Sequence, residues 1–127
     1  MLTNAPVAPT LPVVDMERAK QFYTEKLGLK LSSAQDDVGG MMFDCGEGTK
    51  LFLYQRGQTK ADNTAASFKV DNVEAEVAEL RGKGVVFEEY DFPGLKTENG
   101  IATIGKTKGA WFKDTEGNIL AVTEMMS

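Results

Sequence analysis

The chain repeats one pattern of secondary-structure signals in its two halves. The segment VVDMERAKQFYTEKLGLKL is similar to KVDNVEAEVAELRGKGVVF in the kinds of residues and their order. Asp15 and Asp71 are 56 positions apart, as are Gly28 and Gly84. Each copy has a short apolar run, an Asp or Asn able to cap a helix, and apolar residues recurring every three or four positions. In the second copy, Asp71 and Glu74 are also spaced as a capping box. Each predicted helix ends at glycine, and β-branched or aromatic residues follow.

A hairpin pattern also occurs in both halves. The segments FDCGEGTKLFLYQ and FKDTEGNILAVTE align Phe43 with Phe112 and Gly48 with Gly117, at an offset of 69. Glycine and asparagine tolerate the positive φ angles of such tight reversals. The larger offset means that thirteen extra residues fall between Tyr90 and Lys108. The segment 91–108 is therefore expected to be a loop, either a lid over a ligand or a plain surface excursion.

Together these patterns predict an α+β fold of two tandem βαβββ modules, at about residues 8–56 and 64–124, in a single domain of 127 residues. Neither module can bury both faces of its sheet alone. We therefore expect curved mixed sheets around a shared cavity.

Composition narrows the function classes. The chain is 42% hydrophobic and 26% charged, which is ordinary for a globular protein, and its apolar runs are too short to span a membrane. No secretory signal is recognised at the N-terminus, so a cytoplasmic protein is expected. The net charge is −5 and the basic residues are scattered, which disfavours nucleic acid and membranes as partners. The chain has no histidine, so an imidazole base, proton shuttle or metal ligand is excluded.

Two motifs resemble those of the vicinal oxygen chelate superfamily, which includes glyoxalases, extradiol dioxygenases, fosfomycin-modifying enzymes and bleomycin resistance proteins. VVDMERAKQFYTEKLGL is similar to the superfamily's first motif, and AWFKDTEGNILAV to its last, with Thr115 in place of the usual proline. The resemblance spans about residues 10–124 and implies the glyoxalase/bleomycin resistance-like fold. It also implies a homodimer.

Many enzymes of this superfamily hold a divalent metal through His or Glu residues on strands of both halves. Carried over residue by residue, the four ligand positions fall on Ala8, Phe52, Ala65 and Ala121. None of these side chains has a lone pair to offer a metal. We therefore predict no metal site of the family type and no cofactor.

Strand alternation then predicts which side chains face the cavity. The expected ligand-binding residues are Phe52, Tyr54, Ala65, Ser67, Trp111, Ile119, Ala121 and Thr123. Further lining is expected from Ala8, Thr10, Pro12, Met42, Arg56 and Lys69. The opposite parity should pack beneath the helices: Leu11, Val13, Leu51, Leu53, Phe68, Val70, Leu120 and Val122. Flat aromatic faces beside small residues suit an apolar or aromatic molecule, although such side chains can also simply fill an interior.

Two other features invite a catalytic interpretation. Cys45 is a candidate nucleophile, but its alignment with Asp114 favours a turn residue. Glu88, Glu89, Asp91 and Glu98 are candidate acids and bases, but solvated charge beside a loop is the commoner explanation.

The leading hypothesis is thus a metal-free protein that binds a small apolar or aromatic ligand. The net negative charge of the chain would favour a ligand that carries a positive charge. The alternatives are a metal-independent enzyme using carboxylates or Tyr23 and Tyr54 as acid-base groups, a dimerisation module, and, last, a metal-dependent glyoxalase or dioxygenase.

Overall fold

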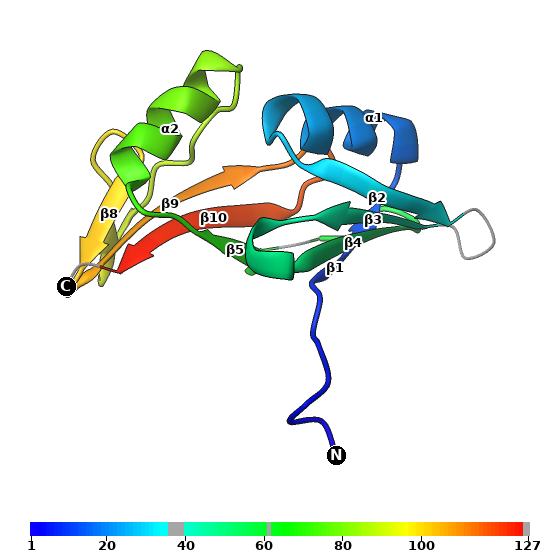
Figure 1. Ribbon diagram of the computed structural model, residues 1–127. Helices are drawn as coiled ribbons and strands as arrows, with labels where there is room; N and C mark the ends of the chain where they lie inside the picture. Colours follow the sequence, from blue (N-terminus) through cyan, green and yellow to red (C-terminus); the bar gives the residue numbers. More distant parts are fainter. Residues whose placement is uncertain (36–39, 61, 126–127) are drawn as a thin grey trace. The chain divides into compact units, whose positions relative to one another are not determined.

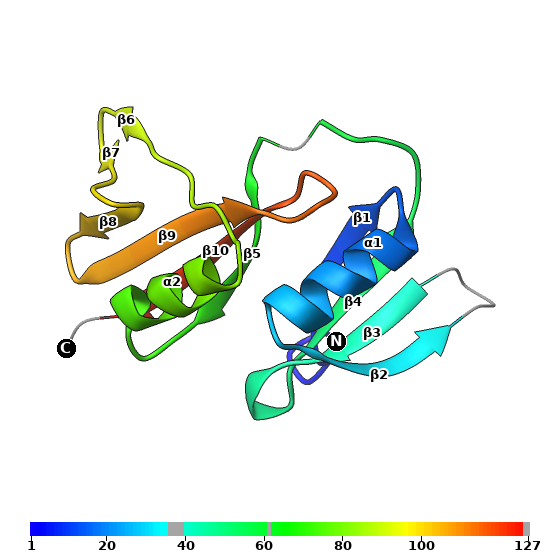
Figure 2. The same ribbon diagram turned by 90° about the horizontal axis from the view of Figure 1, so that it is seen from above.

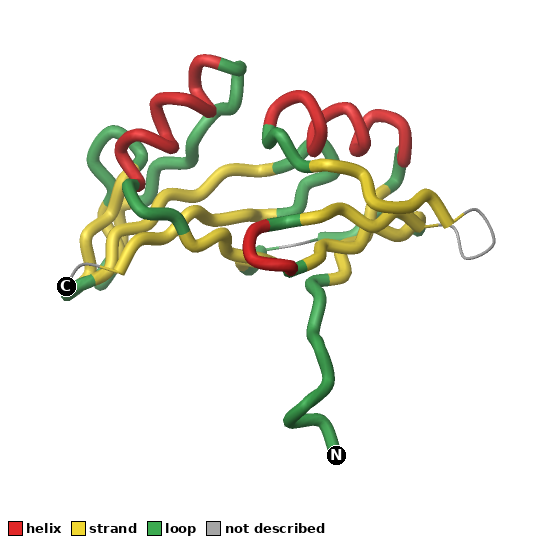
Figure 3. The backbone as a smooth tube through the Cα atoms, in the orientation of Figure 1, coloured by secondary structure: helices red, strands yellow, loops and turns green. Residues whose placement is uncertain are grey.

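The structure is a computed structural model that describes residues 1–35, 40–60 and 62–125. The chain forms two compact units, Met1–Thr59 and Lys60–Ser127. Each contains one four-stranded sheet with a helix on one face, as the red helices and yellow strands of Figure 3 show. No helix in the described part of the chain is long and apolar enough to cross a membrane.

Unit one contains strands β1 (Thr10–Val13), β2 (Lys30–Gln35), β3 (Gly40–Asp44) and β4 (Lys50–Gln55). Their order is β1-β4-β3-β2, with β1 parallel to β4 and the other pairs antiparallel. Helix α1 (Met16–Gln21) continues as a π-helical turn, η1 (Phe22–Lys26), over one face of this sheet (Figure 1). The hairpin between β3 and β4 contains a 3-10 turn, η3 (Gly46–Gly48).

The first helix begins where the sequence predicts. The Oδ1 atom of Asp15 accepts a hydrogen bond from the backbone N–H of Arg18 at 3.0 Å, satisfying a donor of the first turn. Ala19 and Tyr23 are buried, and the Tyr23 ring lies 5.7 Å from that of Phe43 on β3. The predicted helical spacing therefore marks the face that packs on the sheet.

Unit two contains β5 (Thr64–Lys69), α2 (Val73–Gly82), β8 (Ile101–Ile104), β9 (Thr107–Lys113) and β10 (Ile119–Met125). The sheet order β5-β10-β9-β8 mirrors that of unit one, with β5 parallel to β10. A separate hairpin, β6 (Asp91–Phe92) and β7 (Leu95–Lys96), lies between α2 and β8 in the chain (Figure 2). The predicted α+β fold of two βαβββ modules is confirmed, with one hairpin inserted in the second.

The proposed capping box of the second helix is wrong. Asn72 caps α2, since its side-chain oxygen accepts from the N–H of Ala75 at 3.0 Å. The N–H of Val73 donates to Oε1 of Glu124 on β10 at 2.8 Å. Glu74 instead pairs with Lys108 on β9 at 2.9 Å. A local cap by Asn72 and a tertiary contact from Glu124 therefore take the place of the capping box at this helix start.

The segment 91–108, expected to be a loop, contains strand β8 and the start of β9. Phe87 bridges to Phe112 of β9, and Ile101 pairs with Ala110 of the same strand. Fourteen positions separate Phe87 from Ile101, whereas their partners on β9 are two positions apart. Glu88 still bonds to Trp111 of β9, so the twelve extra residues are 89–100, here called the insertion. The outer strand beside β9 is therefore interrupted: Phe87 belongs to its first piece, β8 is its second piece, and the insertion lies between them.

The core of each unit lies between helix and sheet, as strand alternation predicts. The buried strand residues on the helix side are Leu11, Val13, Phe43, Leu51 and Leu53 in unit one and Ala110, Phe112, Leu120 and Val122 in unit two. Phe68 and Val70, expected in the same set, are only half-buried.

Candidate functional site

The sheet face opposite the helix, here called the open face, carries the predicted site residues of each unit. Residues directly opposite one another on paired strands project to the same face. In unit one, Phe52 stands between Thr10 of β1 and Met42 of β3, and Tyr54 stands between Pro12 and Gly40. Phe52, Tyr54 and Met42 are half-buried.

The ring of Phe52 lies over the backbone of Gly40. A Cβ atom at residue 40 would stand 2.8 Å from Cε1 of that ring and 2.9 Å from the carbonyl oxygen of Leu53. Only glycine leaves room for this aromatic group, so the ring and the missing side chain are parts of one arrangement.

Unit two has the same arrangement built from a different strand. Gly109 is 69 positions after Gly40, the offset that relates the two hairpins. The indole of Trp111 lies beside Gly109, and a Cβ at residue 109 would meet its Cη2 atom at 3.2 Å. The aromatic group comes from β4 in unit one and from β9 in unit two.

This difference explains why residue 121 is as small as alanine. Ala121 stands between Trp111 and Ser67 across the sheet, and its equivalent in unit one is Phe52. Ala121 is 1% exposed and Trp111 is half-buried. A small residue on β10 fits the large indole on β9, whereas in unit one the large ring on β4 faces Met42 on β3.

The other predicted ligand residues are distributed along the same sheet. Ser67 is exposed, Thr123 is half-buried beside Lys69 and Gly109, and Ile119 is buried opposite Lys113. The register between β10 and β5 shifts after Ile119, which leaves Ala65 as the extra residue of a bulge. Whether any of these residues holds a ligand stays a prediction.

The four family ligand positions occupy different places along their strands. Phe52 and Ala121 lie in the middle of their strands, Ala65 lies at the bulge, and Ala8 precedes β1. Among residues 1–35, 40–60 and 62–125, no three His, Cys, Asp or Glu side chains lie close enough together to hold a metal ion.

Two aromatic residues outside the predicted site extend from Trp111: Tyr90 contacts the indole, and Phe92 contacts Tyr90. The Tyr90 ring is 5.7 Å from the indole at an interplanar angle of 68°, and the Phe92 ring is 5.7 Å from that of Tyr90. Burial, followed by the nearby charge of Glu88, raises the pKa of Tyr90, so its hydroxyl remains protonated. The aromatic residues of the YDF segment could have suggested this position, but the segment has no counterpart in the first half from which its place could be predicted.

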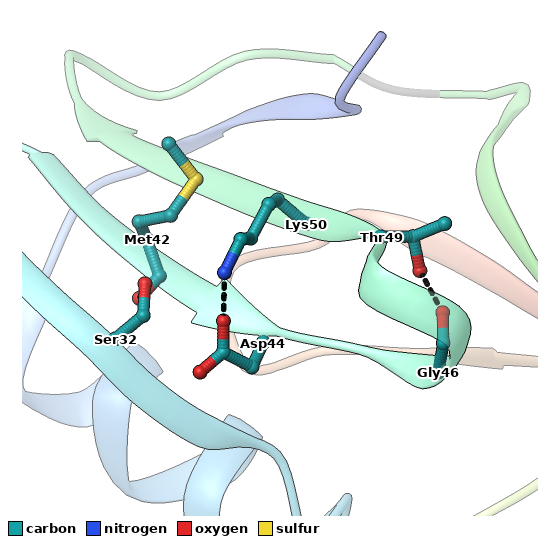
Figure 4. A network of polar contacts seen from close by, with 6 residues as sticks. All are labelled: Ser32, Met42, Asp44, Gly46, Thr49 and Lys50. Carbon is teal, nitrogen blue, oxygen red and sulfur yellow. Dashed lines mark hydrogen bonds and ion pairs between the residues drawn. The ribbon is translucent and has the colours of Figure 1, made fainter. Parts of the chain in front are cut away.

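Cys45 belongs to the turn between β3 and β4. Its N–H donates to the carbonyl of Thr49 at 2.8 Å, as the N–H of Asp114 donates to the carbonyl of Asn118 at 2.9 Å in the equivalent turn. Figure 4 shows the neighbouring contacts, in which Lys50 pairs with Asp44 and the Thr49 hydroxyl donates to the Gly46 carbonyl. Burial and then Asp44 raise the pKa of the Cys45 thiol, against a smaller opposing effect of Lys50. A protonated thiol in a turn is a poor nucleophile.

Two of the four acidic candidates around the insertion, Glu88 and Glu89, have side-chain partners. Glu88 pairs with Lys113 at 3.6 Å, and Glu89 accepts hydrogen bonds from Thr97 and Gly100. Tyr23, considered as an acid-base group, is 0% exposed in the core of unit one. A side chain buried in this way is not accessible to a substrate, which argues against that role.

A βαβββ unit used twice along one chain, with one open sheet face in each, is the architecture that the sequence resemblance implied. The model of the Glyoxalase/Bleomycin resistance protein/Dioxygenase superfamily matches residues 6–122, and the chain belongs to this superfamily. A comparison with curated protein sequences finds no match.

Solved structures agree on the fold. TnmS3, an antibiotic binding protein from Streptomyces sp. CB03234, is 24% identical with a TM-score of 0.69, over 98% of both chains. Lactoylglutathione lyase from Agrobacterium tumefaciens is 18% identical with a TM-score of 0.69, over 98% of this chain and 96% of that one. The fosfomycin resistance protein FosX from Listeria monocytogenes, complexed with Mn(II) and sulfate ion, is 11% identical with a TM-score of 0.71, over 97% of this chain and 91% of that one.

Proposed function

We propose that this protein binds a small apolar or aromatic molecule on the open faces of its sheets without a metal ion. The observation that carries the proposal is that the open faces present partly exposed aromatic side chains and, at the family's ligand positions, side chains that cannot bind a metal. Phe52, Tyr54 and Trp111 lie on open faces, and two of the four family ligand positions, Phe52 and Ala121, lie on those same faces with no lone pair to offer.

The chemistry of these faces favours binding over turnover. Aromatic rings and small residues supply contact area for a ligand. General acid-base catalysis needs a carboxylate, phenol or imidazole of suitable pKa at the reacting atoms. The chain has no histidine, and the carboxylates Glu88 and Glu89 near the insertion are engaged by Lys113 and Thr97. TnmS3, similar in fold, is an antibiotic binding protein, which supports binding as a function that this fold serves.

Thermal stabilisation by a panel of aromatic compounds tests the proposal. Compounds that bind should raise the melting temperature, and the rise should grow with the logarithm of the ligand concentration once this exceeds Kd. Trp111→Phe and Phe52→Leu should reduce the shift. The matched control is Val86→Ala, because Val86 is 77% exposed and lies outside the strands of both open faces. A panel that produces no shift, or shifts equal in all variants, would contradict the proposal.

The metal-free part needs a separate measurement. The protein is incubated with Zn²⁺, Ni²⁺ or Fe²⁺, desalted and analysed for bound metal. We expect far less than one ion per chain, whereas stoichiometric retention would restore the metalloenzyme hypothesis. The cytoplasmic location and the homodimer stay predictions, and light scattering on the purified chain tests the second.

A further inference from the structure

The insertion in unit two is held by a carboxylate. Oε1 of Glu89 accepts hydrogen bonds from the Thr97 hydroxyl at 2.5 Å and from the N–H of Gly100 at 3.0 Å. The two contacts join the start of the insertion to its end. Arg81 of α2 adds a third attachment, since its Nη2 donates to the carbonyl of Asn99 at 2.8 Å.

The same contacts fix the backbone of Tyr90. Its N–H donates to Oγ1 of Thr97 at 2.8 Å, and its carbonyl accepts from the N–H of Thr97 at 2.9 Å. Thr97 is 8% exposed. Because the Thr97 hydroxyl donates to Glu89 while accepting from Tyr90, the carboxylate orients the group that holds Tyr90.

Tyr90, Phe92 and Trp111 form what is here called the aromatic corner. The Tyr90 ring meets the indole of Trp111 nearly edge to face, at 68°, and the Phe92 ring is tilted by 48° against that of Tyr90. Phe92 is 53% exposed and the other two are half-buried. Two flat surfaces at a steep angle therefore remain partly accessible on this unit.

The corner also contains a polar group. In the described part of the chain, no hydrogen bond engages the Tyr90 hydroxyl, which burial and Glu88 keep protonated. A protonated phenol beside an indole can donate to an acceptor on the edge of a stacked ring.

We propose that residues 89–100 select the ligand, that Glu89 is a positioning residue acting through Thr97 on Tyr90, and that the aromatic corner takes a planar fused aromatic ring bearing a hydrogen-bond acceptor. This inference rests on the proposed binding function and names its ligand class. The corner is assembled before binding, so a planar ligand gains contact without the ordering cost of a mobile loop.

Three probes separate shape from polarity: acridone is planar with a carbonyl, carbazole is planar without one, and benzophenone has a carbonyl but is twisted. Binding is followed by quenching of Trp111, the single tryptophan of the chain. Acridone should bind about 10-fold more tightly than benzophenone, with carbazole between them, as expected for one or two aromatic contacts and a hydrogen bond.

Variants of the insertion test the role of Glu89. Glu89→Ala should weaken acridone binding by about 3- to 10-fold, the value of one positioned aromatic contact, and leave benzophenone nearly unchanged. Glu89→Gln keeps an acceptor and should restore most of the selectivity. Glu98→Ala is the matched control, since Glu98 is an exposed carboxylate of the same insertion. Tyr90→Phe should remove the preference for acridone over carbazole but retain the preference for planarity.

Each result has a defined meaning. Selectivity that survives in Glu89→Ala, with circular dichroism showing both variants folded, overturns the positioning role. A wild-type protein that binds compounds of the wider panel but does not prefer acridone overturns the ligand class and leaves the proposed binding function intact. If neither the probes nor the panel bind, both proposals fail.

Discussion

Phe52 and Gly40 form a ring-over-glycine contact across β4 and β3. A Cβ at residue 40 would stand 2.8 Å from Cε1 of Phe52 and 2.9 Å from the backbone carbonyl oxygen of Leu53. The ring can move aside, but the carbonyl belongs to the neighbouring strand and cannot. Residue 40 therefore tolerates no side chain without a shift of the backbone.

Gly40→Ala should consequently destabilise the protein by about 1–3 kcal/mol, the usual cost of overpacking. Gly109→Ala should cost less, because its closest neighbour is the movable edge of Trp111 at 3.2 Å. Urea unfolding measures both. Gly57→Ala is the control, since nothing lies within 4 Å of a Cβ there, and equal losses at residues 40 and 57 would contradict the account.

The start of α2 gives a second prediction. Asn72→Ala removes the side-chain acceptor of the Ala75 N–H and should lower the unfolding free energy by about 1 kcal/mol. Asp71→Ala should change stability by less than about 0.5 kcal/mol, as for an ordinary surface substitution. Chemical denaturation of the two variants decides between the observed cap and the local capping box, which requires the larger effect at Asp71.

The environment of Cys45 gives a third prediction, about the pH at which its thiol reacts. Because burial and Asp44 raise the pKa of the thiol, alkylation by iodoacetamide should reach half its maximal rate at a higher pH than for free cysteine. Asp44→Asn should move that midpoint down, and Lys50→Met should move it up. A midpoint below that of free cysteine would mean an activated thiol and would revive the nucleophile hypothesis.

Glu89 gives a prediction about pH. Its hydrogen bond from Thr97, then that from Gly100, with a further contribution from Arg81, hold the pKa of this carboxyl below its usual value. A carboxyl with a lowered pKa in the folded state stabilises the fold above its unfolded pKa. That contribution is lost as the pH falls through the folded value.

The insertion should therefore stay attached under mildly acidic conditions and release only below the usual glutamate range. Acrylamide quenching of Trp111 measures this, because Tyr90 lies against the indole. Glu89→Gln has no carboxyl to titrate and should show no such transition. A transition of the same midpoint in this variant would assign the change to another group.

Much of the fold follows from local patterns. Asp15 and Asn72 mark helix starts, and alternation along β4 separates Leu51 and Leu53 from Phe52 and Tyr54. These features depend on neighbours a few residues away, which is why sequence predicts them.

The remainder depends on distant contacts. Glu124 satisfies the N–H of Val73 from 51 residues away, and no local pattern marks such a partner. Tyr90 joins Trp111 because twelve residues leave a strand and return to it. Periodicity cannot detect an interrupted strand, since each piece alone is too short to show alternation.

The interruption also affects how unit two ends its sheet. An outer strand exposes a row of unpaired N–H and C=O groups to which a foreign strand can add, and short outer strands reduce that hazard. Strand β8 offers only the four residues Ile101–Ile104, whereas its counterpart β2 in unit one runs for six. The departure of the chain at Phe87 thus leaves unit two with a blunted border, less suited to recruiting strands from other molecules and to aggregation.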